Sequence, residues 1–214
     1  MLRTIPRQLR IHAPFTAFGA VTGIVIVALV VHLDVPRTTS MGLFWTFHPI
    51  HVLLSALVTA GMYRLHGKGG VWQTLLIGYF GSVGIATLSD CIIPYIGEML
   101  LNLPHREIHV GVFEKWWLVN PLAAVGIALA YFRPRTKFPH AGHVLLSTWA
   151  SLFHMTMAIG THLDAVMLVL IAAFLFLAVW IPCCMSDIVF PLLFATRKTE
   201  TCAEVQVDVN RGQA

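Results

Sequence analysis

The stretch HPIHVLLS at residues 48–55 returns as HAGHVLLS at residues 140–147, ninety-two positions later in a chain of 214 residues. Six of the eight positions are identical, and they include both histidines. A second shared motif closes the next long apolar run in each case: SDCIIP at residues 89–94 and SDIVFP at residues 186–191. The sequence therefore predicts two copies of one unit, in which an H-x-x-H helix precedes a helix that carries S-D-x-x-x-P.

The composition of the chain indicates a membrane protein. Hydrophobic residues make up 57% of it, charged residues make up 11%, and the mean hydropathy is +0.76, whereas a soluble domain carries about 25% charged residues. Apolar runs of about 20 residues are typical of transmembrane helices, which satisfy their own backbone hydrogen bonds in lipid. Six runs predict an all-α polytopic membrane protein; they cover residues 15–33, 51–63 (extending back toward 43), 71–103, 116–132, 143–162 and 165–194.

The repeat predicts how these segments are organised. Each unit holds three helices, an odd number, so the second unit would lie inverted relative to the first, as in many secondary transporters. We expect a basic N-terminal segment (1–14), repeat 1 (15–103), an external linker (104–115), repeat 2 (116–196) and a disordered tail (197–214).

The basic residues predict the orientation. In this topology, eleven of the fourteen lysines and arginines lie on the cytoplasmic side, where such residues gather. Both termini are therefore expected in the cytoplasm, with the protein in the plasma (inner) membrane.

The two motifs together supply a set of candidate metal ligands. Histidines at i and i+3 share one face of a helix, and two imidazoles with a carboxylate from the next helix suit zinc or another first-row divalent ion. A charge within hydrocarbon costs roughly 2.5–3.5 kcal/mol on insertion scales, so these carboxylates should face the bundle interior, a watery cavity or a cation. The predicted ligands are His48, His51, Asp90, His140, His143 and Asp187, with Ser89 and Ser186 as accessory residues that orient the carboxylates.

Two questions about these motifs stay open. Ser-Asp can instead cap a helix that resumes after a break, since both residues are common N-caps. The topology places the first set of ligands toward the outer face and the second set toward the inner face, but helix breaks at Pro94, Pro182 or Pro191 would let the two sets meet near the midplane.

Four further ionisable residues lie outside the repeated motifs and are accessory candidates. His105 and His109 belong to HREIH in the external linker, where they would share a face if the segment is helical. They could supply ligands to the outer set or form an entry patch, but we favour the interpretation that they form an ordinary polar turn at the membrane interface. His154 lies in the fifth apolar run, and Glu98 lies in the apolar stretch YIGEMLL.

The duplicated ligands favour a transporter or channel-like protein that handles a divalent metal cation. Protons could be coupled to the metal, because protonation of imidazole and carboxylate would release it. The first alternative is an intramembrane metal-dependent hydrolase of a lipid-like substrate. The inventory of three histidines, an aspartate and a serine resembles that of the alkaline-ceramidase-like hydrolases, although the order and spacing here differ. The second alternative is a b-type haem electron-transfer protein, with His51 and His154, or His143 and His66, as axial ligands.

The remaining patterns limit the partners. The expected ones are the lipid bilayer and a small cation, with a homo-oligomer or a partner subunit left open. No basic run suits nucleic acid, and no P-loop, GxGxxG motif or nucleophile elbow is present. The four cysteines lack C-x-x-C spacing; they are Cys91, Cys183, Cys184 and Cys202. The expected cofactor is therefore a divalent metal ion held by histidine and aspartate.

Overall fold

The computed structural model describes residues 4–67, 69–134, 137–159, 165–184 and 190–194, and all regular structure within these ranges is helical. The long helices are α1 (Thr4–His32), α2 (Arg37–His66), α7 (Trp116–Phe132), α8 (Lys137–Ala158) and α9 (Ala165–Cys184). A further helix runs without interruption from Val71 to Leu100, and two short ones are α6 (Gly111–Glu114) and α10 (Phe190–Phe194). The prediction of an all-α fold is confirmed.

The helix bounds differ from the predicted apolar runs mainly where polar residues extend a helix. The first predicted run begins at residue 15, but α1 begins at Thr4, and α8 begins at Lys137 rather than at residue 143. Helical backbone geometry does not require apolar side chains, so a helix can continue through polar residues beyond the end of its apolar stretch. The predicted tail, residues 197–214, lies outside the described residues.

Three of the described helices are long and apolar enough to cross a membrane: Arg37–His66, Val71–Leu100 and Val166–Cys183. Two shorter apolar helices, Thr16–His32 and Trp116–Phe132, lie beside them. Many apolar side chains point outward, among them Trp72, Phe113 and Phe132, each more than three-quarters exposed. An apolar exterior is compatible with insertion into lipid.

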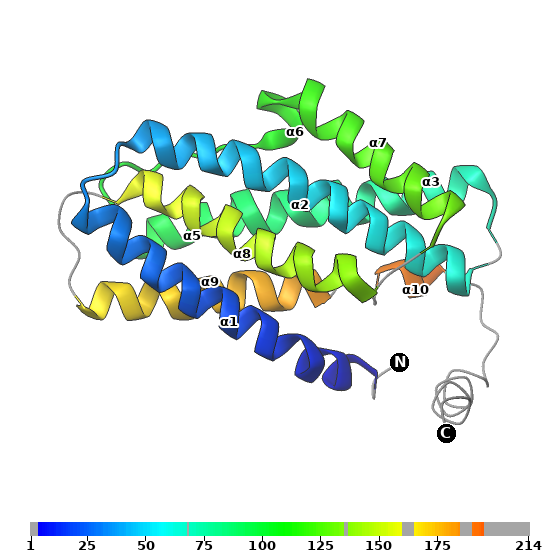
Figure 1. The fold of residues 1–214 in the computed structure, drawn as a ribbon, viewed down its shortest axis with the longest axis horizontal. Coiled ribbons are helices and arrows are strands. Elements are labelled where there is room, and N and C mark those ends of the chain that lie inside the picture. Colours follow the sequence, from blue (N-terminus) through cyan, green and yellow to red (C-terminus); the bar gives the residue numbers. More distant parts are fainter. Residues whose placement is uncertain (1–3, 68, 135–136, 160–164, 185–189, 195–214) are drawn as a thin grey trace.

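Helices α2 and α8 lie side by side at the centre of the bundle (Figure 1). They run antiparallel, because His51 on α2 contacts His143 on α8, whereas Phe44, earlier on α2, contacts His154, later on α8. Helices α1 and α9 pack against each other, and α7 packs against α2. A Cβ atom on Gly126 of α7 would lie 2.4 Å from the Leu53 carbonyl oxygen of α2, so the small residue permits this close approach, as is common between membrane helices.

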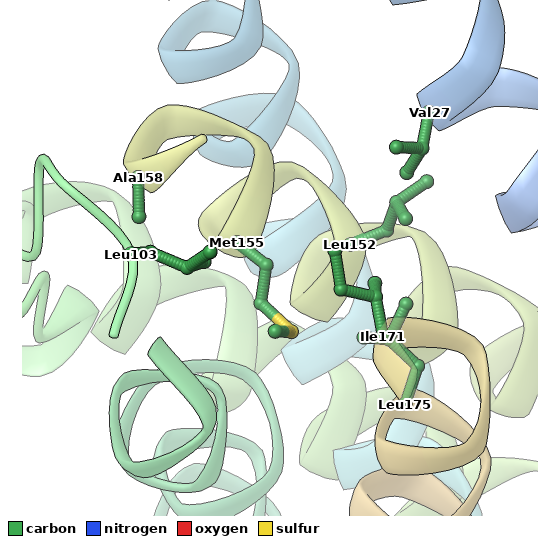
Figure 2. Packing of buried hydrophobic residues seen from close by; sticks show 7 residues of the cluster. All are labelled: Val27, Leu103, Leu152, Met155, Ala158, Ile171 and Leu175. Atoms are coloured by element: carbon green, nitrogen blue, oxygen red, sulfur yellow. The ribbon is translucent and has the colours of Figure 1, made fainter. Parts of the chain in front are cut away.

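One core cluster joins α1, α8, α9 and the segment that follows Leu100 (Figure 2). Its side chains interdigitate at the end of the bundle where α8 finishes, and they hold the segment of residues 101–110 against α8. The cluster consists of Val27, Leu103, Leu152, Met155, Ala158, Ile171 and Leu175.

The helix Val71–Leu100 contains two π-helical turns. Its parts are α3 (Val71–Tyr79), the π-turn η1 (Phe80–Gly84), α4 (Ile85–Thr87), the π-turn η2 (Leu88–Ile92) and α5 (Ile93–Leu100). Pro94 lacks an N–H group, and in a regular α-helix its ring would clash with the carbonyl of Asp90, four residues earlier. A wider turn at Leu88–Ile92 relieves this conflict, and such turns are frequent at functional sites. The helix therefore bulges at Pro94 and does not break there.

Candidate metal centre

Asp90 lies in the π-turn η2 and is fully buried between α2 and α8. Its Oδ2 atom lies 2.9 Å from Nδ1 of His48 and 2.6 Å from Nδ1 of His51. Both histidines come from one face of α2, as their i, i+3 spacing requires. The three predicted ligands of the first repeat therefore meet in one buried cluster, which we call the Asp90 cluster.

Two serine hydroxyls donate hydrogen bonds to the other oxygen of the same carboxylate. Ser89 donates to Oδ1 of Asp90 at 2.7 Å, and Ser147 of α8 donates to it at 2.8 Å. Ser151, one turn further along α8, lies 3.0 Å from the backbone carbonyl of Ser89. Asp90 therefore has four hydrogen-bond partners from three helices, which offsets the cost of burying its charge. Ser89 and Asp90 make no helix cap, because the helix continues through them.

A second group of ligand atoms shares His51 with the first. The rings of His51 and His143 stack at 5.7 Å with an angle of 16° between their planes. His51, His143 and Cys183 offer ligand atoms that all lie within 4.8 Å of one another, and so do His48, His51 and Asp90. Nitrogen, oxygen and sulfur donors in this combination suit zinc and related divalent ions.

The distances within the Asp90 cluster are those of hydrogen bonds. Ligand atoms around a tetrahedral zinc ion lie about 3.3 Å apart when the metal–ligand bonds are roughly 2.0–2.1 Å. The 2.6 and 2.9 Å separations at Asp90 are shorter, so an ion would take the place of the shared protons and spread its ligands by about half an ångström. The donor set fits a divalent metal, and the hydrogen bonds hold the ligands together without one.

A second polar cluster lies next to the end of α8. Glu98 of α5 and His154 of α8 are both buried, and Nδ1 of His154 lies 2.7 Å from Oε1 of Glu98. The backbone N–H of His109 donates to Nε2 of His154 at 3.3 Å, and the rings of these two histidines lie 5.7 Å apart. We call Glu98, His154 and His109 the Glu98 cluster. Phe44 separates it from the Asp90 cluster, since its ring contacts both His48 and His154.

The segment of residues 101–115 touches both clusters. His109 contacts His154 as described, and a Cβ atom placed on Gly111 would lie 2.3 Å from Nε2 of His48. Only a glycine fits at this position without displacing the His48 ring, so the segment lies directly against the ligand.

The structure places the other predicted residues as follows. His143 approaches His51, so one histidine of each H-x-x-H motif meets the other. His140 lies on α8, but its side chain, like all of Ser186 and Asp187, lies outside the described residues. The HREIH segment is not helical, which corrects the shared face considered for it; His105 is exposed while His109 is buried.

Sequence reasoning missed Ser147 and Cys183. Ser147 is the last residue of the repeated HAGHVLLS, and its position four residues after His143 places it on the same helical face, so the signal was present. Cys183 had no comparable signal, because only the packing of α9 against α8 brings it to His143.

The two haem ligand pairs are not supported by these positions. His66 is exposed at the end of α2 and bonds to the Met62 carbonyl, fifteen residues or about 22 Å of helix from His51, where His143 lies. His154 packs on Phe44, which is seven residues or about 10 Å along α2 from His51. Stacked imidazoles such as His51 and His143 also differ from axial ligands, which point at an iron from opposite sides.

No protein-family model, curated protein or solved structure that was compared with the chain matches it. The chemistry of the site therefore rests on its own geometry.

Proposed function

We propose that this chain is an integral membrane protein that carries a divalent metal cation through a site between two inverted repeats. The observation that carries the proposal is the position of His51. It belongs to two buried ligand groups at once, one with His48 and Asp90 of the first repeat and one with His143 and Cys183 of the second. A cation held by the first group can pass to the second while His51 stays bound.

The packing of the helices supports the inversion. In such a pair of repeats, α1, α2 and Val71–Leu100 correspond to α7, α8 and α9. Equivalent contacts then come in pairs: α2 with α7 matches α1 with α8, and α1 with α9 matches α3 with α7. Inversion exchanges α2 with α8 and His51 with His143, so it maps their contact, including the stacking of the two rings, onto itself. The antiparallel course of α2 and α8 is the one that inversion requires.

The buried position of the ligands favours transport over hydrolysis. An intramembrane hydrolase would need an open coordination position for water and substrate, whereas the Asp90 carboxylate has hydrogen-bond partners on both oxygens. A transported ion needs ligands that exchange easily. Hydrogen bonds to the same atoms allow this exchange, because they keep the ligand side chains in position after the ion has left.

The test combines metal binding with metal flux. Purified protein in detergent is loaded with zinc and examined by elemental analysis, and protein in liposomes is assayed for zinc uptake with an enclosed fluorescent indicator. We expect Asp90→Asn and His51→Gln each to lower zinc affinity at least ten-fold, because each removes a ligand. His66→Gln is the matched control, since His66 is an exposed histidine on the same helix.

Two results would contradict the proposal in different ways. Wild-type protein that binds no zinc, manganese, iron or cobalt would refute the metal site. Wild-type protein that binds metal but gives no flux down a metal gradient would refute transport and leave the site in place.

A further inference from the structure

Glu98 has an unusual hydrogen-bonding position for a buried carboxyl group. Only 1% of its surface is exposed, and its Oε1 atom is paired with Nδ1 of His154. Its Oε2 atom is buried and has no hydrogen-bond partner among the described residues. Buried polar atoms nearly always have a partner, so the bare oxygen marks a place where a ligand belongs.

The protonation form of His154 follows from its two neighbours. The amide N–H of His109 points at Nε2, so this nitrogen must act as an acceptor and cannot carry a proton. The proton of the neutral ring therefore lies on Nδ1, which donates to Oε1 of Glu98. His154 is fixed as a neutral donor and supplies no positive charge to the carboxyl group.

In the part of the chain that the structure describes, His154 is the one basic side chain within 4 Å of the Glu98 carboxylate. From the linker, His109 directs Nδ1 to Glu114 of α6 at 3.2 Å, and Glu114 also accepts the Val110 amide at 2.8 Å. From α2 come the ring of Phe44, which contacts His154 and His109, and the ring of Trp45, which contacts His109 and carries the Lys115 ammonium over it at 5.8 Å. From α9 comes Phe174, which packs against Gly97.

These neighbours restrict what the bare oxygen can bind. A metal ion would need several ligand atoms close together, and among the described residues Glu98, His154 and His109 do not form a group of three ligand atoms within 4.8 Å of one another, as His48, His51 and Asp90 do. A proton needs only one lone pair. An isolated carboxylate in apolar surroundings is costly, and a proton on Oε2 removes that charge while the hydrogen bond from His154 stays intact.

We infer that Glu98 and His154 form a proton-binding site that is separate from the Asp90 cluster. The carboxylate takes up one proton on Oε2 and becomes a carboxylic acid, while His154 keeps its own proton on Nδ1. His109 lies between the site and the surface: its backbone N–H contacts His154, its side chain is largely buried, and its Nε2 lies 3.9 Å from the exposed carboxylate of Glu107. A role for this site in coupling protons to metal transport rests on the function proposed above, whereas proton binding by Glu98 does not depend on that function.

Infrared spectroscopy tests the proton site without any transport. Wild-type protein containing 13C-labelled glutamate should show the carbonyl band of a buried glutamic acid at neutral pH. Glu98→Gln should remove this band, and Glu107→Gln, which changes an exposed glutamate of the neighbouring segment, should leave it. A labelled wild-type spectrum with carboxylate bands alone would overturn the proposal even if no variant folds, and so would a band that survives Glu98→Gln.

A flux measurement tests the coupling role. In liposomes with an enclosed pH indicator, wild-type protein should move protons when a zinc gradient is applied. Glu98→Gln should abolish this proton signal and should keep the zinc stoichiometry of the wild type. Loss of zinc binding in Glu98→Gln would show that Glu98 belongs to the metal site, whereas a persistent proton signal would refute its role in coupling.

Discussion

The Asp90 cluster and the Glu98 cluster each pair a carboxylate of the helix Val71–Leu100 with histidines from other segments, but they differ in how many hydrogen bonds the carboxylate accepts. Asp90 has two imidazoles on one oxygen and two hydroxyls on the other. Glu98 has one imidazole, and its second oxygen is bare in the described structure. The Asp90 cluster therefore brings several possible ligand atoms together, whereas the Glu98 cluster leaves one oxygen atom that can bind a proton.

The two clusters also differ in their relation to the repeat. His48, His51 and Asp90 all have sequence counterparts in the second unit, at His140, His143 and Asp187. The offset of 97 residues that relates the S-D motifs carries Glu98 to Ala195, and the offset of 92 that relates the histidine motifs carries His154 to Met62. Under the predicted repeat, neither Glu98 nor His154 therefore has a counterpart of its own residue type, and the Glu98 cluster is not part of the duplicated motifs.

Among substitutions of residues that are not metal ligands, Gly111→Ala should have the largest effect, and it should act on the Asp90 cluster rather than on the Glu98 cluster. The new Cβ atom would lie 2.3 Å from Nε2 of His48, so the ring must move away from Asp90. We expect zinc affinity to fall about ten-fold and the free energy of unfolding to fall by about 2 kcal/mol, as for overpacking of a buried site. Zinc titration and thermal unfolding in detergent measure the two effects.

Gly42→Ala is the control for this variant, because a Cβ atom there meets nothing within 4 Å and the glycine lies within α2. It should leave zinc affinity unchanged and raise stability by roughly 0.5–1 kcal/mol through helix propensity. If Gly111→Ala binds zinc like the wild type, the linker does not position His48, and the two clusters are not joined through it.

Ser147→Ala should have an intermediate effect and should be confined to the Asp90 cluster. It removes one hydroxyl from Oδ1 of Asp90, and a hydrogen bond to a charged group contributes roughly 1.5–3 kcal/mol. We expect a loss of stability near the lower value and a zinc affinity reduced by less than that of Asp90→Asn. Ser151→Ala is the comparison, since Ser151 contacts a backbone carbonyl of Ser89 rather than the carboxylate. Equal effects on zinc affinity would argue that Ser147 acts only by packing.

Glu107→Gln should have the smallest effect on stability. Glu107 pairs with Arg37 at the surface, and the two side chains are 56% and 42% exposed. Exposed pairs contribute roughly 0.2–1 kcal/mol and are screened by salt. We therefore expect a small drop in unfolding temperature at low salt that disappears at high salt. A large, salt-independent drop would mean that this pair fixes the linker over both clusters.

Much of the central site could be predicted from the sequence, because its signals are local. The spacing of His48 and His51 places both rings on one face of a helix, and the position of Asp90 in apolar sequence predicts a buried carboxylate with partners. The repeat of HxxHVLLS even contained Ser147. The bulge at η2 was not predicted, since Pro94 permits either a break or a wider turn, and only packing against neighbouring helices selects between them.

The sequence by itself determined the helical, apolar character of the chain and the residues that would pair within each motif, since helical periodicity and hydropathy act over a few neighbouring positions. Only the tertiary structure decided that His51 meets His143, that Cys183 joins them, and that Gly111 and His109 lie against the buried histidines. These contacts depend on how antiparallel helices cross and on where a linker returns to the bundle. Contacts between segments that are distant in the sequence cannot be predicted from the pattern of neighbouring residues.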